Sequence, residues 1–416
     1  MQLILDRILS RLVKRGTLRV TYPGGEVRQY GGGSGPSAAL RFRDAATMRR
    51  IASYTGLYFG EAYMDGGVEP QGCTIYEVLD VLLSNAEVAG SANPLIAFRG
   101  RLDQLGRRIS QYNPAARARR NVAHHYDLNG RLYSLLLDRD RQYSCAYFPR
   151  GDETLDEAQA AKKRHIASKL LLDRPDLTVL DIGCGWGGTA LTLARDYGAR
   201  VLGITLSTEQ LEAARARAAA EGLADRVRFE LQDYRAANGQ FDRIVSVGMF
   251  EHVGVGHFGT FFQAVRRCLR PDGVALIHAI GRSEGPGTTN PWLRKYIFPG
   301  GYSPALSEVL PAVERSGLVA TDIEILRLHY AKTLRLWRAN LAARREAIAA
   351  LYDERFCRMF EFYLAGCELA FRLQGHMVWQ MQLAPPGAAA VPLTRDYMVE
   401  AERRAAAHAE RVAERA

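Results

Sequence analysis

Short apolar runs alternate with helical patterns through the second half of the chain. The runs are rich in β-branched residues, which is typical of buried strands. Two stretches between the runs, 189–197 and 209–221, have helical periodicity instead. We therefore predict an α/β fold with a parallel sheet and helices on both faces. The predicted strands are 178–182, 200–206, 227–231, 243–247 and 274–280, the last after a turn at 271–273.

Two more strand-like runs, at 319–325 and 376–383, complete a predicted seven-stranded sheet. Between them, residues 333–352 and 354–373 have the amphipathic spacing of surface helices. After Pro385 and Pro386 the composition changes, and the tail is rich in Ala, Glu and Arg. We predict a solvated terminal helix from Thr394 onward.

The first part of the chain has a different pattern. Apolar residues of segment 1–15 fall on one helical face, basic residues lie off that face, and Gly16 ends the predicted helix. A strand at 17–22, a glycine-rich turn at 31–35 and a helix end at 60–66 follow. We predict four parts: a small mixed α+β domain at 1–110, a linker at 111–125, a larger domain at 126–385 and a helical tail at 386–416.

The apolar pattern also bears on membrane segments. Asp6, Arg7 and Arg11 interrupt the N-terminal apolar run, and no small-residue cleavage site follows, so we expect no signal peptide. No apolar run reaches the roughly 18 residues of a membrane-spanning helix. We expect no transmembrane segment.

Charge changes the picture of possible partners. The formal net charge is +10, which indicates an anionic partner such as nucleic acid or an anionic membrane surface. Arginines cluster at 99–120, and this segment is either a solvated hinge or a phosphate-contacting patch. No zinc-finger spacing or RNA-binding signature is present. No two of the six cysteines form Cys-x-x-Cys, so we expect reduced thiols, as in a cytoplasm, and no zinc or redox pair.

The most informative motif follows the strand 178–182. Asp181 precedes Gly183, Cys184, Gly185 and Gly187 in a Gly-x-Gly-x-Gly spacing, which differs from the Gly-x-Gly-x-x-Gly of dinucleotide folds. Glycines there let the backbone turn sharply and approach a ligand. The arrangement resembles the first motif of class I S-adenosylmethionine methyltransferases. The resemblance implies that Asp181 holds the cationic amino end of the methionine moiety, whereas an ordinary tight turn is the alternative.

The next two strands supply further cofactor candidates. Most such methyltransferases place an acid after the second strand to hold the ribose, and this chain does not. We predict that side chains or backbone groups of residues 205–210 bind the ribose instead of that acid. We predict that the residues directly after the third strand contact the adenine. A turn cap is the alternative for Asp233. The candidates are Thr205, Leu206, Ser207, Gln210, Asp233 and Tyr234.

A set of segments in a fixed order gives a more specific resemblance. Together they resemble the cyclopropane fatty-acyl-phospholipid synthases and their mycolic-acid relatives, over roughly residues 50–384. The resemblance implies a Rossmann-like seven-stranded S-adenosylmethionine-dependent methyltransferase domain behind a small mixed α+β domain, with Tyr143 and Ser144 also binding the cofactor. The segments are 142–148, 250–254, 277–281, 295–301, 329–334 with Trp337, 362–371 and 379–380.

The resemblance also implies a base for the reaction. Family members are thought to bind bicarbonate, whose ligands correspond here to the backbone at Cys145 and Ile280 and the side chains of Glu251, His278 and Tyr330. Each has a simpler alternative: Glu251 as a helix cap, His278 as a satisfied core histidine, Tyr330 as a wedge and Cys145 as a packing residue. Cys367 matches a cysteine once treated as the family's nucleophile, and we expect it to pack instead.

The chemistry explains why such residues are needed. An alkene is a weak nucleophile, so it requires the sulfonium methyl as its electrophile, and methyl transfer to a cis double bond leaves a carbocation. Ring closure then requires loss of a proton to a base in a site with little water. The aromatic candidates for an acyl channel, each of which can also belong to a core, are Tyr147, Phe250, Phe258, Tyr296, Phe298 and Phe362.

The predicted partner is the acyl chain of an unsaturated phospholipid. We expect a cytoplasmic protein peripheral to the inner membrane face, bound through the N-terminal helix and the arginine-rich linker, with a homodimer possible and no nucleic acid. Three alternatives stay open: a relative that leaves a methyl- or methylene-branched chain, an inactive lipid binder, and a nucleic-acid methyltransferase. The last lacks the Asn/Asp-Pro-Pro-Tyr type motif.

Overall fold

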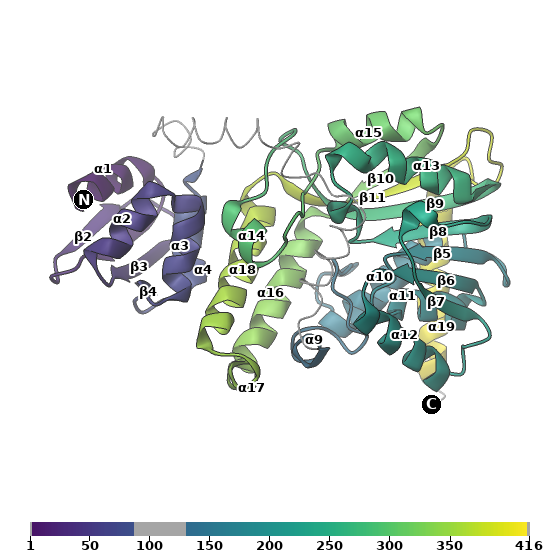
Figure 1. Ribbon diagram of the computed structural model, residues 1–416, viewed down its shortest axis with the longest axis horizontal. Helices are drawn as coiled ribbons and strands as arrows, with labels where there is room; N and C mark the ends of the chain where they lie inside the picture. The colour runs from purple at the N-terminus through teal and green to yellow at the C-terminus, as the bar shows by residue number, and fades with distance from the viewer. Residues whose placement is uncertain (1, 87–129, 414–416) are drawn as a thin grey trace. The chain divides into compact units, whose positions relative to one another are not determined.

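A computed structural model describes residues 2–86 and 130–413 (Figure 1). The predicted linker and the whole arginine-rich segment at 99–120 lie outside the described residues. The chain forms two compact units. Unit 1 comprises residues 1–110, 288–299 and 334–375, and unit 2 comprises residues 111–287, 300–333 and 376–416.

Unit 1 is built on a four-stranded sheet in the order β2-β1-β3-β4. Strand β1 runs antiparallel to β2 and parallel to β3, and β3 runs antiparallel to β4. Helix α1 confirms the predicted N-terminal helix and buries Leu5 and Leu9 in the core of the unit. The elements of this part are α1 (Gln2–Leu12), β1 (Thr17–Thr21), β2 (Val27–Gly31), β3 (Ser37–Phe42), α2 (Ala45–Ser53), α3 (Thr55–Met64), β4 (Val68–Pro70) and α4 (Ile75–Leu83).

Unit 1 also contains later segments of the chain. Helix α18 (Glu354–Leu373) packs against α3 and α4, where Ala365 and Leu369 join the same core. Glu61 on α3 accepts hydrogen bonds from Lys295 at 2.7 Å and Tyr296 at 2.9 Å, which ties α14 (Pro291–Tyr296) to α3. The compact units therefore do not follow the predicted domain order, because these packed segments come from residues 288–299 and 334–375. The domain boundaries themselves stay predictions.

Unit 2 contains the predicted seven-stranded sheet, in the order β10-β11-β9-β8-β5-β6-β7 (Figure 1). Helices lie on both of its faces. The five alternating strands β5 to β9 are parallel as predicted, whereas β11, one of the two runs that complete the sheet, runs antiparallel to both of its neighbours. The predicted turn at 271–273 is an irregularity inside β9, where pairing with β8 passes from Leu269 directly to Val274.

The elements of unit 2, together with those that continue from it, are as follows. The strands are β5 (Thr178–Ile182), β6 (Arg200–Thr205), β7 (Val227–Leu231), β8 (Phe241–Val247), β9 (Leu269–Arg282), β10 (Val319–Ile325) and β11 (His376–Ala384). The helices are α9 (Gly130–Leu136), α10 (Leu155–Lys169), α11 (Gly188–Tyr197), α12 (Thr208–Ala220), α13 (Phe258–Cys268), α15 (Leu306–Arg315), α16 (Arg327–Ala343), which continues into unit 1 with α17 (Arg345–Leu351), and α19 (Asp396–Ala413).

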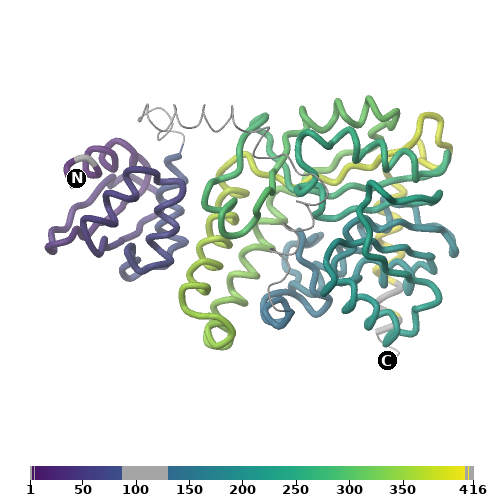
Figure 2. Tube along the Cα trace, viewed as in Figure 1, coloured from purple at the N-terminus to yellow at the C-terminus, as the bar shows by residue number. Residues whose placement is uncertain are grey.

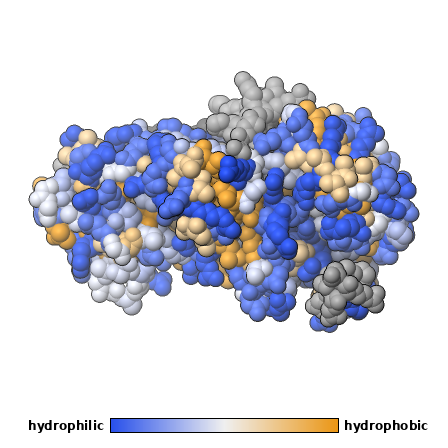
Figure 3. All heavy atoms as spheres, turned by 90° about the horizontal axis from the view of Figure 1, so that it is seen from below, coloured by the Kyte–Doolittle hydropathy of each residue, from blue (hydrophilic) through white to orange (hydrophobic). Residues whose placement is uncertain are grey.

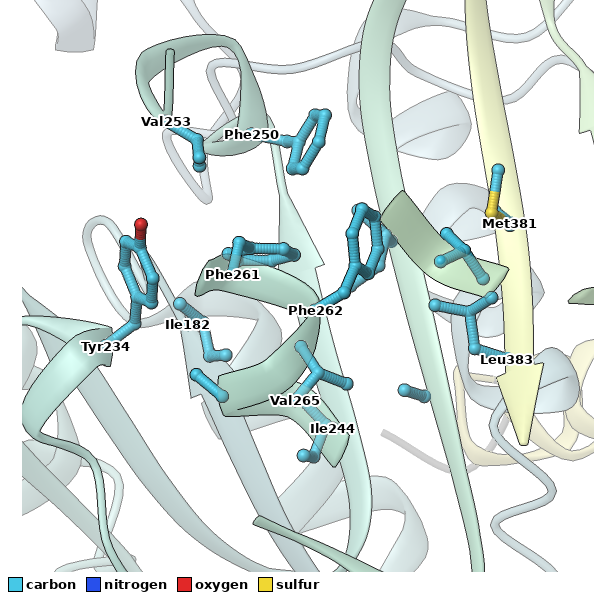
Figure 4. Close-up of a cluster of buried hydrophobic side chains, with 14 of the residues drawn as sticks. Ile182, Tyr234, Ile244, Phe250, Val253, Phe261, Phe262, Val265, Met381 and Leu383 are labelled. Carbon is cyan, nitrogen blue, oxygen red and sulfur yellow. The ribbon is translucent and has the colours of Figure 1, made fainter. Parts of the chain in front are cut away.

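One face of the large sheet is covered by aromatic side chains of α13 and of the turn before it. Figure 4 shows Phe261 and Phe262 of α13 beside Phe250, whose ring stacks on Phe258 with centroids 4.8 Å apart. All four are buried in one cluster with residues of β5, β8, β9 and β11. Phe250 and Phe258, two of the candidates for an acyl channel, therefore belong to the core.

The C-terminal helix is docked, which corrects the prediction of a solvated tail. Helix α19 packs on α10 and buries Met398. Glu402 of α19 pairs with Nδ1 of His165 on α10, and Tyr397 accepts a hydrogen bond from Gln382 of β11 at 2.6 Å. In Figure 2 the C-terminal part of the trace lies among the strands and helices of this unit. The composition of the tail, rich in Ala, Glu and Arg, did not reveal this, because polar side chains such as Glu402 and Tyr397 contribute to the contact.

Two surface findings bear on partners. Among the described helices, none has both the length and the apolar character needed to cross a bilayer. Hydrophilic side chains cover most of the face drawn in Figure 3, with hydrophobic ones between them.

Candidate active site

A cavity lies at the carboxyl ends of β5, β6 and β8, where ligand sites of open α/β sheets form. Its empty volume is about 1110 Å³, part of it open to solvent. Most of the predicted cofactor residues line it, whereas Gly187 and Ser207 do not. The predicted residues that line it are Tyr143, Ser144, Asp181, Gly183, Cys184, Gly185, Thr205, Leu206, Gln210, Asp233 and Tyr234.

The glycine loop between β5 and α11 needs its glycines for two different reasons. Gly183, Gly185 and Gly187 all have positive φ, at 85°, 54° and 81°, which disfavours other residues. A Cβ at Gly187 would lie 2.7 Å from the Phe229 ring, so this glycine lets α11 pack on the sheet. A Cβ at Gly185 meets nothing within 4 Å, so that position faces open space in the cavity wall.

Asp181, near the end of β5, is a buried acid facing this cavity. Its side chain is 2% exposed, and Oδ2 has no hydrogen-bond partner among the described residues. Burial raises the pKa of Asp181 to about 7, and the positive charge of Lys162 opposes that rise. A cationic ligand group would supply the missing partner, so the carboxylate fits the ammonium of S-adenosylmethionine.

The ribose-side candidates form a local network. Thr205 donates a hydrogen bond to Oε1 of Gln210 at 3.0 Å, and the backbone N–H of Ser207 donates to Thr205. Ser207 is the N-cap of α12, and its hydroxyl accepts from the Gln210 N–H at 3.3 Å. Ser207 therefore shapes the turn that presents Thr205 and Gln210.

Asp233 has the turn-cap role that was its alternative, and it also lines the cavity. It caps the turn after β7 by accepting from the Arg235 N–H at 2.9 Å, and it pairs with the Arg235 guanidinium at 3.2 Å. It also lines the cavity beside Tyr234. A contact of Asp233 with the adenine stays a prediction.

The second group of candidates lies beside the cavity. Glu251 sits in a short 3-10 turn after β8, and its Oε1 accepts the Ile280 N–H at 2.6 Å. Its Oε2 is buried and has no hydrogen-bond partner among the described residues. Burial raises the pKa of Glu251 to about 7, so this carboxyl can exchange a proton near neutral pH.

His278 on β9 adjoins both the cavity and Glu251's turn. Its carbonyl accepts the N–H of Gly248, a cavity residue, at 2.9 Å. Its Nδ1 lies 3.1 Å from Nε2 of Gln380 on β11. Burial lowers the pKa of His278 far below its ordinary value, and nearby lysines lower it further, so the ring is neutral.

The segment with Cys145 is held against the start of α16, where Tyr330 lies. The Ala146 N–H donates to Thr333 at 3.1 Å, and the Phe148 N–H donates to His329 at 3.0 Å. Cys145 and Tyr330 are both buried. Burial raises the pKa of the Cys145 thiol, which suits a packing role or a backbone contact and not a thiolate.

Cys367 belongs to unit 1, on α18. Burial of its thiol raises its pKa to about 12. A thiol at neutral pH is a poor nucleophile, which supports the expected packing role. None of the six cysteines forms a disulfide.

Several site residues were missed from the sequence. Gln142, Trp186, Met249 and His252 line the cavity, and Lys162 of α10 contacts its wall. In the sequence Lys162 is one of several charged residues in a polar helix, so nothing in the pattern marked it as a site residue. Its inward orientation depends on the packing of α10.

Comparisons with known proteins agree with this arrangement. A family model described as mycolic acid cyclopropane synthetase matches residues 114–381, and one for a domain of unknown function matches residues 4–93. The chain is 41% identical over 350 residues to a cyclopropane-fatty-acyl-phospholipid synthase of Escherichia coli (strain K12), which covers 84% of this chain and 88% of that protein.

Two further similar proteins have names that describe different reactions, one a methyl transfer and the other a cyclopropane synthesis. The tuberculostearic acid methyltransferase UfaA1 of Mycobacterium tuberculosis is 37% identical over 404 residues, covering 92% of this chain and 91% of that protein. The solved structure of the mycolic acid cyclopropane synthase CmaA1, in complex with SAH and CTAB, matches with a TM-score of 0.60 and 35% identity. It covers 66% of this chain and 99% of that one.

Proposed function

Because the chain belongs to the mycolic acid cyclopropane synthetase family, we propose that it transfers a methylene from S-adenosylmethionine to the cis double bond of an unsaturated phospholipid acyl chain. It is an S-adenosylmethionine-dependent methyltransferase. The observation that carries the proposal is a pair of buried carboxyls at neighbouring strand ends. Asp181 near the end of β5 and Glu251 after β8 each keep one oxygen without a partner among the described residues.

In the proposal the first carboxyl, that of Asp181, binds the cofactor. Asp181 and the glycine loop hold the methionine part in the proposal, and Thr205 and Gln210 hold the ribose. S-adenosylmethionine supplies an electrophilic sulfonium methyl when bound. The buried wall of the cavity limits water beside a developing carbocation.

In the proposal the second carboxyl, that of Glu251, helps to hold the base that accepts the proton. Glu251, His278 and Tyr330 would hold a bicarbonate together with the backbone at Cys145 and Ile280. Bicarbonate supplies a proton acceptor for ring closure. Neutral His278 and the Tyr330 hydroxyl can each donate a hydrogen bond to an anion, and Oε2 of Glu251 can accept one.

Membrane contact is assigned to α1 in this proposal. Leu3 is 75% exposed, and Arg7 and Arg11 are exposed on the same helix. Apolar insertion and attraction to anionic headgroups would together keep the protein on the inner face of the cytoplasmic membrane. The variant R7E/R11E should lose binding to anionic liposomes while E77Q, on α4, keeps it; equal binding of both variants would contradict this role.

A second product has a specific observation in its favour. One relative, 37% identical and covering 92% of this chain, is named a tuberculostearic acid methyltransferase and not a cyclopropane synthase. Methyl transfer followed by loss of a proton without ring closure would leave a methyl- or methylene-branched alkene. An inactive lipid binder is less well supported, because both unpartnered carboxyls and the glycine loop are retained.

Product analysis tests the proposal. Purified full-length protein is incubated with S-adenosylmethionine, bicarbonate and liposomes of cis-unsaturated phospholipid, and the acyl chains are analysed by mass spectrometry and NMR. The proposal predicts a gain of one methylene and a ring. A branched chain would establish the alternative, and no gain despite cofactor binding would contradict both.

A further inference from the structure

The segment 139–148 serves both halves of the site and has no regular secondary structure of its own. Arg141, Gln142, Tyr143 and Ser144 line the cofactor cavity, and Cys145 follows directly in the candidate base site. A segment of this kind holds its shape through side-chain hydrogen bonds and not through a backbone ladder. Its precision therefore depends on what it is bonded to.

Two side chains of α10 supply those bonds. Nζ of Lys162 donates to Oε1 of Gln142 at 2.6 Å and to the hydroxyl of Ser144 at 2.8 Å. Nε2 of Gln159, one turn earlier, donates to the carbonyls of Gln142 and Ser144 at 3.2 and 3.0 Å. Both Lys162 and Gln159 are 0% exposed.

Burying the Lys162 ammonium to hold the segment 139–148 has a high desolvation free energy. Removing a charge from water costs far more than burying an amide, and Gln159 already bonds the same two residues. The Lys162 bonds reach side chains that face the cofactor cavity, whereas the Gln159 bonds reach only backbone carbonyls. We therefore expect the positive charge of Lys162 to matter at the cofactor cavity, and not only for holding the segment 139–148.

We propose that Lys162 is a positioning residue of the transfer reaction, which orients Gln142 and Ser144 in the cofactor cavity and holds Cys145 in register beside it. The inference rests on the proposed cofactor site. The surrounding electrostatics agree with it: after burial, the Lys162 charge is what opposes protonation of Asp181. Besides Asp181 and His278, the charged and titratable groups that interact with Lys162 are Asp138, Lys163, Asp140 and Cys145.

The test measures the affinity of the full-length protein for S-adenosylhomocysteine by calorimetry, beside the thermal unfolding midpoint. Lys162→Met should weaken binding roughly ten-fold or more, because the orientation of Ser144 is lost. Lys169→Met is the matched control, since Lys169 lies on the same helix, is equally buried and pairs with Glu324 of β10. It should lower the unfolding midpoint and leave the affinity unchanged.

A double-mutant cycle separates positioning from general stability. If Lys162 acts through Ser144, the pair K162M/S144A should bind no more weakly than the weaker single variant. Lys162→Gln, an uncharged donor, serves where the methionine variant does not fold, and the same loss of affinity is expected. Wild-type affinity for either Lys162 variant, or additive effects in the cycle, would overturn the proposal. The proposed function fails separately, if wild-type protein binds S-adenosylhomocysteine and makes no product.

Discussion

The backbone N–H of Ile280 donates a 2.6 Å hydrogen bond to Oε1 of Glu251. This bond joins the turn after β8 to the end of β9, next to His278. It occupies one oxygen of the carboxyl and fixes its plane, while Oε2 stays without a partner among the described residues. A carboxyl held in this way is oriented before any ligand arrives, which is what a site for proton transfer requires.

The pH dependence of turnover should report Glu251. Burial raises its pKa to about 7, so the carboxylate form is scarce well below pH 7 and predominates above it. If the carboxylate takes part in accepting the proton, kcat of the wild type at saturating S-adenosylmethionine, where Asp181 is paired with the cofactor, should rise with pH through a midpoint near 7. Glu251→Gln should lower kcat by about 10²- to 10⁴-fold and remove that limb.

The exposed Glu314 on α15 provides a matched control for the same measurement. Glu314→Gln should keep both the rate and the pH limb. An unchanged limb in Glu251→Gln would assign the midpoint to another group and contradict the role of Glu251.

Two substitutions in the glycine loop should have different main effects, one on the stability of the fold and the other on cofactor binding. Gly187→Ala places a Cβ 2.7 Å from the Phe229 ring at a φ of 81°, so it should lower the free energy of unfolding by about 1–3 kcal/mol more than Gly185→Ala. Gly185→Ala projects into open space at the cavity wall and should mainly weaken binding of S-adenosylhomocysteine. Urea denaturation and calorimetry measure the two effects, and a reversed order would mean that the loop packs differently.

Cys367 should be dispensable for chemistry. Burial raises the pKa of its thiol to about 12, so almost no thiolate is present at neutral pH. Cys367→Ala should therefore keep most of the wild-type kcat, with a small loss of stability from the lost packing. A folded variant without activity would restore the nucleophile hypothesis.

The docked C-terminal helix should depend on Glu402. This residue pairs with His165, whose pKa is raised: burial alone would lower it, but hydrogen bonds to Glu324 and Glu402 outweigh that. Glu402→Ala should lower the free energy of unfolding by about 1.5–3 kcal/mol, whereas exposed Glu400→Ala on the same helix should change it little.

The same pair has a predictable pH window. A histidine whose folded pKa lies above its ordinary 6.5 contributes stability that is fully present below 6.5 and is lost as the pH rises through the folded value. The difference between wild type and Glu402→Ala should therefore be largest in mildly acidic buffer and shrink at alkaline pH. A difference that grows with pH would contradict the ion pair.

The β-branched runs were sufficient to predict β5, β7 and β10 with their observed bounds. The glycine motif and the order of the strands placed Asp181 and Thr205 at one cavity, because the carboxyl ends of parallel strands meet at one sheet edge. The reversal of β11 was not predictable from its own residues, since strand direction depends on its neighbours. The burial of Lys162 and the ion pair of Glu402 were not predicted, because a charged residue in a helix gives the same sequence pattern whether it is buried or solvated.

Ring closure is the central claim, and deuterium retention tests it most directly. S-adenosylmethionine with a fully deuterated methyl group is supplied to the wild-type protein with unsaturated phospholipid liposomes, and the product is analysed by mass spectrometry and NMR. Loss of one deuterium to the base should leave a ring that carries two deuterium atoms and no remaining double bond. A methyl branch that retains all three deuterium atoms beside a double bond in the chain, or a deuterated exocyclic alkene, would contradict the account.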